Sequence, residues 1–206
     1  QMLPGIEQGS EGYSNLFVRG GDVDQNLMLY NGTPIYNSNH LFGLSSTFHN
    51  RSIDNTAIYR GIAPARYGGR SSSVISLESK KTGDFSGLVG EFEMTTLNAG
   101  VYLENIKKDK SYFTMAARRS WIDLLVPVES KQNTANANIY DLQLNFGKKL
   151  ENDDKIDVSV MNTRDLYYQV FTSLDSNAST SSSYGFTQTW SNLLASVKYT
   201  QNYSKK

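Results

Sequence analysis

Side chains that could perform covalent chemistry are few in this sequence, and they do not form known catalytic motifs. The 206 residues include no cysteine and only two histidines, His40 and His49, which excludes a thiolate zinc site, a histidine-rich metal site and a disulfide framework. The nucleophile-elbow pattern GxSxG does not occur, and the glycines at 5–12 and 87–90 do not match a phosphate-binding fingerprint. The adjacent acids Asp153 and Asp154 fall in a polar turn and are expected to be solvated. We therefore predict no catalytic residue, no metal site, no cofactor and no enzymatic activity.

A polar and aromatic loop is better suited to noncovalent binding. The loop contains Tyr36, Asn37, Asn39 and His40, which offer ring faces and hydrogen-bonding groups beside a turn. A polar binding surface needs groups of these kinds. The alternative is a loop that only packs against a neighbouring surface.

Three arginines, Arg60, Arg66 and Arg70, form a second cluster of interest. A guanidinium group makes planar bidentate contacts with carboxylates. Glu91 and Glu93 would lie on one face of a strand if the aromatic residue between them faces the other way. We hypothesise ion pairs between these arginines and the two glutamates; the alternative is three unrelated surface arginines.

Composition narrows the class of protein that must position these residues. Lys+Arg and Asp+Glu both number 20, and this zero formal charge argues against a nucleic-acid-binding protein. No apolar run approaches the roughly 20 residues that a membrane-spanning helix needs. The 13 tyrosines and 9 phenylalanines are nevertheless abundant for a hydrophobic content of only 38%, and the apolar residues are spread in alternation. Transmembrane β-barrels have this character, because one face of each strand meets lipid and the other a polar lumen.

The sequence divides into two parts near residues 82–84. Residues 1–82 are rich in glycine and contain short β-type runs, including residues 26–30, which stop at the tight-turn pair Asn31-Gly32. Residues 52–60 are expected to be a helical start or turn that runs into a strand, and residues 73–77 a further strand. This part predicts a small α+β domain.

The second part, residues 83–206, has a period of two. Apolar and polar residues alternate in six segments, at 88–95, 99–104, 113–118, 140–146, 156–160 and 193–199. Such alternation predicts strands with one apolar and one polar face. Short charged turns at 105–110 and 151–154 and longer polar connections at 123–138 and 173–184 match the asymmetry of outer-membrane barrels. Alternation alone also fits a soluble β-sandwich, so the pattern leaves both architectures open.

Two consecutive arginines constrain one of these strands. Arg118 and Arg119 cannot both avoid the lipid-facing side of a regular strand, so one should lie near the membrane interface or at the strand's end. Trp121 would suit an aromatic girdle or the core.

Several motifs, in the right order, resemble the TonB-dependent outer-membrane receptor family. The plug-domain pattern of that family (LPGV, a VRGG-like turn, QNLLLLDGVPV and YKGGFPARYGGRLSSVL) is similar to residues 3–5, 17–21, 26–35 and 59–75 here, and RRSYID is similar to residues 118–123. The closest likeness is to the branch that carries a carboxypeptidase-regulatory-like domain before the plug. The closing signature of the glycan-importer branch, AIYGSRGANGV, does not occur.

This resemblance implies an α+β plug domain at residues 1–82, followed by about six antiparallel transmembrane strands of a plugged 22-stranded barrel at residues 83–206. Because 22 strands of roughly 10 residues need about 220 residues, the chain is expected to be an incomplete fragment. The start at Gln1, which has no signal peptide, is consistent with that expectation.

The resemblance also implies partners and sites. A TonB-type energy-transducing protein would act through an N-terminal box upstream of this sequence, and the barrel would contact outer-membrane lipid. A small ligand such as a siderophore, vitamin, peptide or glycan would bind at the plug apex, near Arg19, Tyr36, Asn37, Asn39 and His40. Arg60, Arg66 and Arg70 would join the plug to the barrel wall at Glu91 and Glu93.

The function implied is energy-dependent import of a scarce nutrient across the outer membrane. The alternatives are a TonB-linked signalling receptor and a soluble β-rich binding domain.

Overall fold

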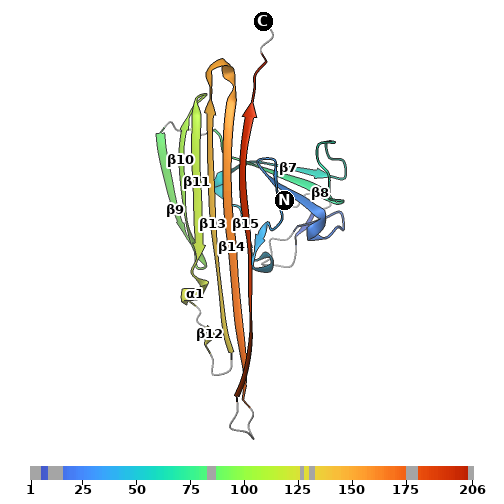
Figure 1. Ribbon diagram of the computed structural model, residues 1–206, viewed down its shortest axis with the longest axis vertical. Coiled ribbons are helices and arrows are strands. Elements are labelled where there is room, and N and C mark those ends of the chain that lie inside the picture. Colours follow the sequence, from blue (N-terminus) through green and yellow to red (C-terminus); the bar gives the residue numbers. More distant parts are fainter. Residues whose placement is uncertain are drawn as a thin grey trace.

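The computed structural model describes residues 6–8, 16–82, 87–125, 128–129, 133–174 and 181–203. The chain forms a small N-terminal module and one large antiparallel sheet, and the module lies against one face of that sheet (Figure 1). Residues 3–5 of the first sequence motif and residues 83–84 of the expected domain boundary lie outside the described residues.

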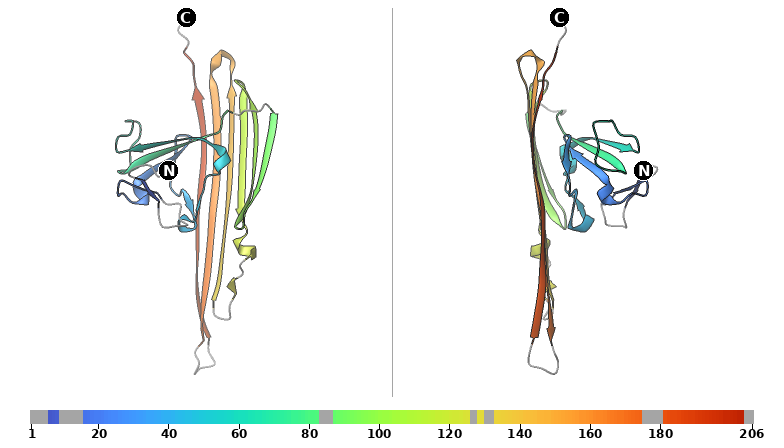
Figure 2. Two further views of the ribbon diagram at one scale, coloured as in Figure 1. Left: turned by 180° about the vertical axis from the view of Figure 1, so that it is seen from behind. Right: turned by 45° about the vertical axis from the view of Figure 1, so that its right-hand side comes forward.

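The N-terminal module, residues 16–82, is built on a four-stranded mixed sheet (Figure 2). Its strand order is β4-β3-β8-β7, in which β3 and β8 are parallel and the other pairs antiparallel. The bounds are β3 Asn26–Tyr30, β4 Thr33–Ile35, β7 Ile53–Arg60 and β8 Ser73–Ser79. The predicted turn is present, because Asn31 and Gly32 have φ of 50° and 84° and join β3 to β4.

Short elements complete the N-terminal part of the chain. A separate β1–β2 pair and a small β5–β6 hairpin accompany three 3₁₀ turns. The bounds are β1 Ile6–Gln8, β2 Leu16–Val18, β5 Asn39–His40 and β6 Ser45–Ser46, with turns at Val23–Gln25, Leu41–Gly43 and Asn50–Ser52. The expected helical start before residues 52–60 is the last of these turns, which leads directly into β7.

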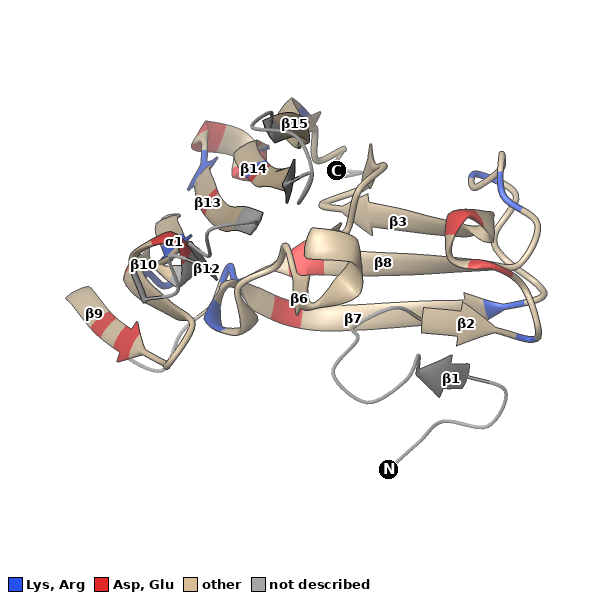
Figure 3. Cartoon of the chain, turned by 90° about the horizontal axis from the view of Figure 1, so that it is seen from below, with Lys and Arg blue, Asp and Glu red and all other residues tan. Residues whose placement is uncertain are grey.

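The large sheet confirms the prediction of about six consecutive antiparallel strands. Its order is β9-β10-β11-β13-β14-β15, so each strand pairs with its neighbours along the sequence, and the two-residue β12 adds to β13. The bounds are β9 Gly87–Met94, β10 Asn98–Lys107, β11 Ser111–Ser120, β12 Val128–Glu129, β13 Asn133–Lys149, β14 Lys155–Leu174 and β15 Ser181–Thr200. A view along the strands shows them end-on, with the module on one side (Figure 3).

The strands of the large sheet differ in length. β9 to β11 have 8 to 10 residues, whereas β13 to β15 have 17 to 20. The short turns at 108–110 and 150–154 lie at one end of the sheet, near the C-terminus. The longer strands continue toward the other end, where the single-turn helix α1, Ile122–Leu125, follows β11 (Figure 1). No helix in the described part of the chain is long and apolar enough to cross a membrane.

The two faces of the large sheet have opposite character. The face turned away from the module carries exposed apolar side chains, such as Phe92 at 70% and Leu193 at 78% exposure. The face turned toward the module carries buried polar groups, including Gln143, Asn145 and Thr163. A soluble sandwich would bury the apolar face of its strands, whereas an outer-membrane barrel turns that face to lipid. The exposed apolar face therefore favours the barrel among the two architectures that alternation left open.

A small apolar core joins the module to the large sheet. Tyr30, Phe48 and Leu77 of the module form one buried cluster with Met161 of β14 and Leu194 of β15. Polar groups dominate the contact around this cluster.

Gly147 of β13 provides space for an aromatic ring. A Cβ atom at this position would lie 1.9 Å from a carbon of the Tyr112 ring on the neighbouring strand β11. The Tyr112 hydroxyl donates a hydrogen bond to Asp157 on β14 at 2.6 Å, which holds the ring over the glycine.

Substitution Gly147→Ala is expected to destabilise the large sheet by about 1–3 kcal/mol, because overpacking forces the ring out of its position. The measurement is the thermal midpoint of the intact protein in detergent, read from heat-modifiable gel migration. Gly68→Ala is the matched control, since a Cβ there meets no atom within 4 Å. In a Tyr112→Ala background the Gly147→Ala change should cost nothing further; a full additional loss would show that the ring is not the cause.

Candidate functional site

A tight turn of the module directs His40 toward the large sheet. β5 ends at His40, and the following Leu41, Phe42 and Gly43 all have positive φ, at 45°, 62° and 108°. This reversal returns the chain into β6, antiparallel to β5. Consequently the His40 side chain is inserted into the face of the large sheet, where it is completely buried.

Two aspartates of the large sheet hold the His40 ring. Nε2 lies 2.5 Å from Asp141 Oδ1 on β13, and Nδ1 lies 2.9 Å from Asp165 Oδ1 on β14. The Leu41 backbone N–H donates to the same Asp165 oxygen at 3.1 Å. Both ring nitrogens face carboxylates, so the doubly protonated imidazolium satisfies both contacts.

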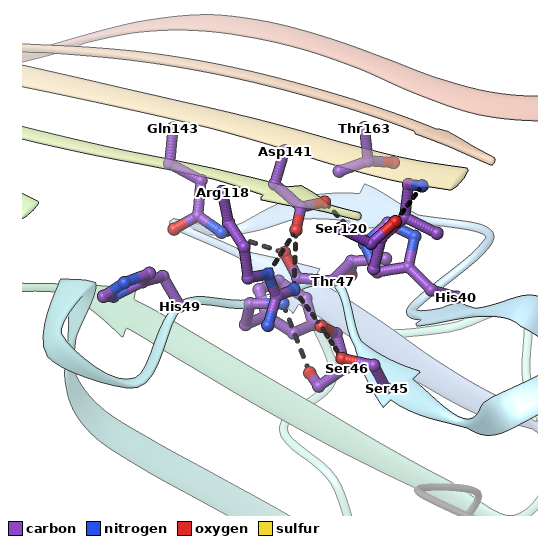
Figure 4. Close-up of polar contacts among 12 residues, drawn as sticks. His40, Ser45, Ser46, Thr47, His49, Arg118, Ser120, Asp141, Gln143 and Thr163 are labelled. Carbon is purple, nitrogen blue, oxygen red and sulfur yellow. Dashed lines mark hydrogen bonds and ion pairs between the residues drawn. The ribbon is translucent and has the colours of Figure 1, made fainter. Parts of the chain in front are cut away.

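Arg118 completes a charge-balanced cluster. Its Nε and Nη2 donate to Asp141 Oδ2 at 2.8 and 2.6 Å, and Nη2 also donates to the Ser46 carbonyl of the module (Figure 4). The two cations, Arg118 and protonated His40, equal the two anions, Asp141 and Asp165. We call these four residues the buried charge cluster; their pairing offsets the cost of removing charges from water.

The pKa values of the two histidines shift in opposite directions. Burial lowers the pKa of His40, but the hydrogen bonds and charges of Asp141 and Asp165 outweigh it and raise the pKa above 6.5. Burial is the largest effect on His49 and lowers its pKa below 6.5. His49 Nε2 lies 3.2 Å from Glu93 but without hydrogen-bond geometry. His49 is therefore neutral at pH 7, and this contact is weak.

Neutral hydrogen bonds extend the contact along β13 and β14. Gln143 donates to the Thr47 carbonyl at 3.0 Å and accepts from the Ser52 hydroxyl at 2.5 Å. The Asn31 amide of the module donates to Asn145 and Ser159 at 3.0 and 2.7 Å. These polar groups satisfy one another's hydrogen bonds across the boundary, so polar groups of the module match the polar face of the sheet.

A cavity of about 520 Å³ lies beside the cluster, between the module and β15. Its lining includes Tyr36, Asn37 and Phe42 of the module, and Gln188 and Trp190 of the large sheet. Asn192 anchors this edge, because it donates to the Asn37 carbonyl at 2.6 Å and accepts from the Asn37 N–H at 3.3 Å. The volume and the mixed lining fit a small ligand.

Residues 1–75 match the family model described as the TonB-dependent Receptor Plug Domain. The N-terminal module is a TonB-dependent receptor plug domain. Such a plug implies location in the outer membrane. The plug is followed by six strands of the kind found in the barrel of these receptors, as the next comparison shows.

The fold is similar to the crystal structure of the siderophore receptor PirA from Acinetobacter baumannii, with a TM-score of 0.52 and 13% sequence identity. The match covers 84% of this chain and 34% of that one, so the chain spans about a third of the receptor's length. No curated protein matches the sequence.

The structure brings three of the expected apex residues together. Tyr36, Asn37 and Asn39 line the cavity at the plug edge. His40 lies behind them in the buried charge cluster and does not line the cavity. Arg19 also lies apart from it, at the end of β2, with its guanidinium against Gly61.

The expected plug-to-barrel arginines are distributed differently. Arg60 is the exposed last residue of β7, Arg66 stacks over the Tyr67 ring at 4.7 Å, and Arg70 lines the cavity. Of these described side chains, neither Arg66 nor Arg70 forms an ion pair with Glu91 or Glu93.

The glutamates do reach the plug through other partners. Glu91 pairs with Arg51 at 2.6 Å, and Glu93 lies beside His49. A further plug-to-sheet ion pair joins Lys80 to Glu104 on β10 at 2.8 Å.

Sequence reasoning did not assign the buried charge cluster as a site. The alternation predicts that Arg118 and Arg119 lie on opposite faces of a strand; in the structure Arg118 faces the plug, and Arg119 pairs with Asp123 at 2.8 Å. A usable signal was present in β13, where Asp141, Gln143 and Asn145 occupy successive positions of the polar face.

Proposed function

We propose that the intact protein imports a scarce nutrient across the outer membrane. A small ligand binds at the extracellular apex of the plug, and a TonB-type protein, powered from the inner membrane, remodels the plug to open a path. The ligand falls among siderophores, vitamins, peptides and glycans, and Tyr36, Asn37 and Asn39 are the plug residues proposed to contact it.

The observation that carries this proposal is the polar match between the plug and the large sheet. The plug is attached mainly by hydrogen bonds and ion pairs, with one small apolar cluster. Water can replace hydrogen bonds at modest net cost, about 0.5–1.5 kcal/mol each. A plug attached in this way can be displaced into a hydrated lumen by an external pull more readily than one attached through a large apolar interface.

Two features of domain organisation belong to the same proposal. Residues 1–82 constitute the plug region and residues 83–206 the first strands of the barrel. The likeness of residues 59–75 to one branch of the family supports a carboxypeptidase-regulatory-like domain upstream of the plug.

The test compares nutrient accumulation in cells with and without the TonB motor. We expect the protein to fractionate with the outer membrane and one nutrient of a screened panel to accumulate only when the motor is present. A soluble protein, or uptake that ignores the motor, would contradict the proposal.

Deletion of residues 1–82 gives a readout that requires no knowledge of the ligand. A barrel without its plug is expected to admit bulky antibiotics such as vancomycin. The vancomycin concentration that inhibits growth of these cells should therefore fall. Unchanged sensitivity, with the deleted protein shown to be in the outer membrane, would mean that the plug does not close the lumen.

A further inference from the structure

Aromatic rings continue from the plug along the inner face of the two longest strands. Phe42 of the plug contacts Trp190 of β15 and Tyr167 of β14, with ring centroids 5.2 and 6.0 Å apart. Tyr167 contacts Phe186 at 5.6 Å. Farther along the same strands, Phe171 stacks on Tyr184 at 5.1 Å and an interplanar angle of 23°. We call these six residues the aromatic ladder: Phe42, Tyr167, Phe171, Tyr184, Phe186 and Trp190.

Strand register places the ladder on the face that meets the plug. In β14 the odd-numbered residues Asp165 and Thr163 are buried against the plug, so Tyr167 and Phe171 share their face. The register pairs Tyr184 with Phe171, which puts Tyr184, Phe186 and Trp190 of β15 on that face too. The plug contacts β14 in the order Asn31 with Ser159, His40 with Asp165 and Phe42 with Tyr167. The ladder therefore continues beyond the plug, away from the short turns and toward the outer ends of the long strands (Figure 1).

Three of the six rings of the ladder are exposed to solvent, and the other three are half-buried. Phe186 is 47% and Tyr184 67% exposed, and Phe42 at the plug end is 57% exposed. β15 is the edge strand of the sheet, but a further strand would pair with its backbone and leave the inner face free. Exposed contiguous aromatic surface is characteristic of a binding site.

Uncharged amides alternate with these rings. Tyr167 is paired with Gln188, and Phe186 is paired with Gln169. From residues 167 to 171 and 184 to 190, the ladder face contains only Tyr, Phe, Trp and Gln. The Gln169 oxygen accepts from the Tyr167 hydroxyl at 2.6 Å, which leaves its NH₂ group able to donate.

The aromatic and amide side chains of the ladder face suit a neutral ligand that has flat rings and polar edges. Aromatic faces stack on flat apolar surfaces, and amide groups exchange hydrogen bonds with hydroxyls. Ladder positions supply no formal charge for an anionic chelate or phosphate. A sugar ring has this chemistry, with C–H groups on its face and hydroxyls at its edge.

We propose that the aromatic ladder is a binding track for a neutral oligosaccharide, which it guides from the outer ends of β14 and β15 to the cavity at the plug edge. Trp190, Gln188 and Phe42 line that cavity, so the track and the cavity are continuous. The inference rests on the proposed import function and specifies its ligand class.

The test is a binding titration with the intact protein in detergent. The probes are neutral hexasaccharides of α- and β-linked glucose, mannose and galactose, and the two comparison ligands are 2,3-dihydroxybenzoate and inorganic phosphate. We expect at least one hexasaccharide to bind and neither comparison ligand to compete with it. Phe186→Ala and Tyr184→Ala should each weaken binding about 3- to 10-fold, as loss of one stacking ring implies.

Tyr168→Ala is the matched control, because Tyr168 lies on β14 between ladder positions and points to the opposite face. It should bind the hexasaccharide as the unmodified protein does, and heat-modifiable migration should be the same for all variants. The proposal of a binding track would be overturned if no hexasaccharide bound, or if the protein preferred dihydroxybenzoate or phosphate. It would also be overturned if the Phe186→Ala variant bound the hexasaccharide as tightly as the unmodified protein.

The track and the import function can fail separately. Motor-dependent uptake that survives both ladder substitutions overturns the track alone. Hexasaccharide binding that is lost in the ladder variants, in cells where uptake ignores the motor, supports the track and overturns the import function.

Discussion

Asp141→Ala is expected to lower the free energy that attaches the plug by about 3–5 kcal/mol, because it leaves two buried cations without their shared partner. Asp141 accepts from both His40 and Arg118, and its side chain is nearly completely buried. The measurement is pulse proteolysis of the intact protein after equilibration in urea, with cleavage scored within the plug. The urea midpoint should fall markedly in the variant.

Two further variants separate charge from other effects. Asp141→Asn keeps a hydrogen-bond acceptor and the side-chain shape, so its midpoint should fall between those of Asp141→Ala and the unmodified protein. Asp153→Ala removes an exposed aspartate paired with Lys149 and should leave the midpoint unchanged. If Asp141→Ala behaved like Asp153→Ala, the cluster would not hold the plug.

The attachment of the plug is expected to weaken as pH rises through the pKa of His40. That pKa lies above its unfolded value of 6.5, so the docked plug binds the proton more tightly than the released plug. The stabilisation is fully present below pH 6.5 and decreases by about 1.4 kcal/mol per pH unit from there until the folded pKa is passed. Above that point Asp141 and Asp165 face a neutral ring, and only Arg118 remains to balance them.

Urea midpoints measured by the same pulse proteolysis, after equilibration between pH 6.5 and 9, test this expectation. His40→Asn should be less stable at pH 6.5 and should lose most of the pH dependence. His49 acts in the opposite sense and at lower pH: its lowered pKa means that acidification below 6.5 weakens the docked state. Midpoints that rise with pH above 6.5 would show that His40 is neutral in the docked plug.

The strands were the most predictable part of the fold. Period-two alternation predicts them because the polarity of each side chain indicates the face of the strand on which it lies, without information from distant parts of the sequence. The strand at residues 26–30 and its Asn31-Gly32 turn also follow from local chemistry, since both turn residues adopt positive φ.

The partners across the plug boundary were not predictable in the same way. The sequence indicated that Glu91 and Glu93 could contact the plug, but a choice between Arg51 and Arg60 or Arg70 depends on how the plug is oriented against the sheet. Orientation is a tertiary property, and a shift of one residue in strand register would turn every side chain to the other face. The same limitation applies to His40, whose residue type suits a binding loop and a buried ion pair equally well.

The contacts of the buried charge cluster also bear on the order of assembly. His40 and its two aspartates are separated by 101 and 125 residues, and Asn31 and Ser159 by 128. Long loops must close before such contacts form, and closing them costs chain entropy before the contacts stabilise the fold. The plug therefore cannot dock until β13 and β14 have formed, although it is synthesised before them. Until then its polar edge is exposed to water, so the plug reaches its place only after strands that follow it in the sequence.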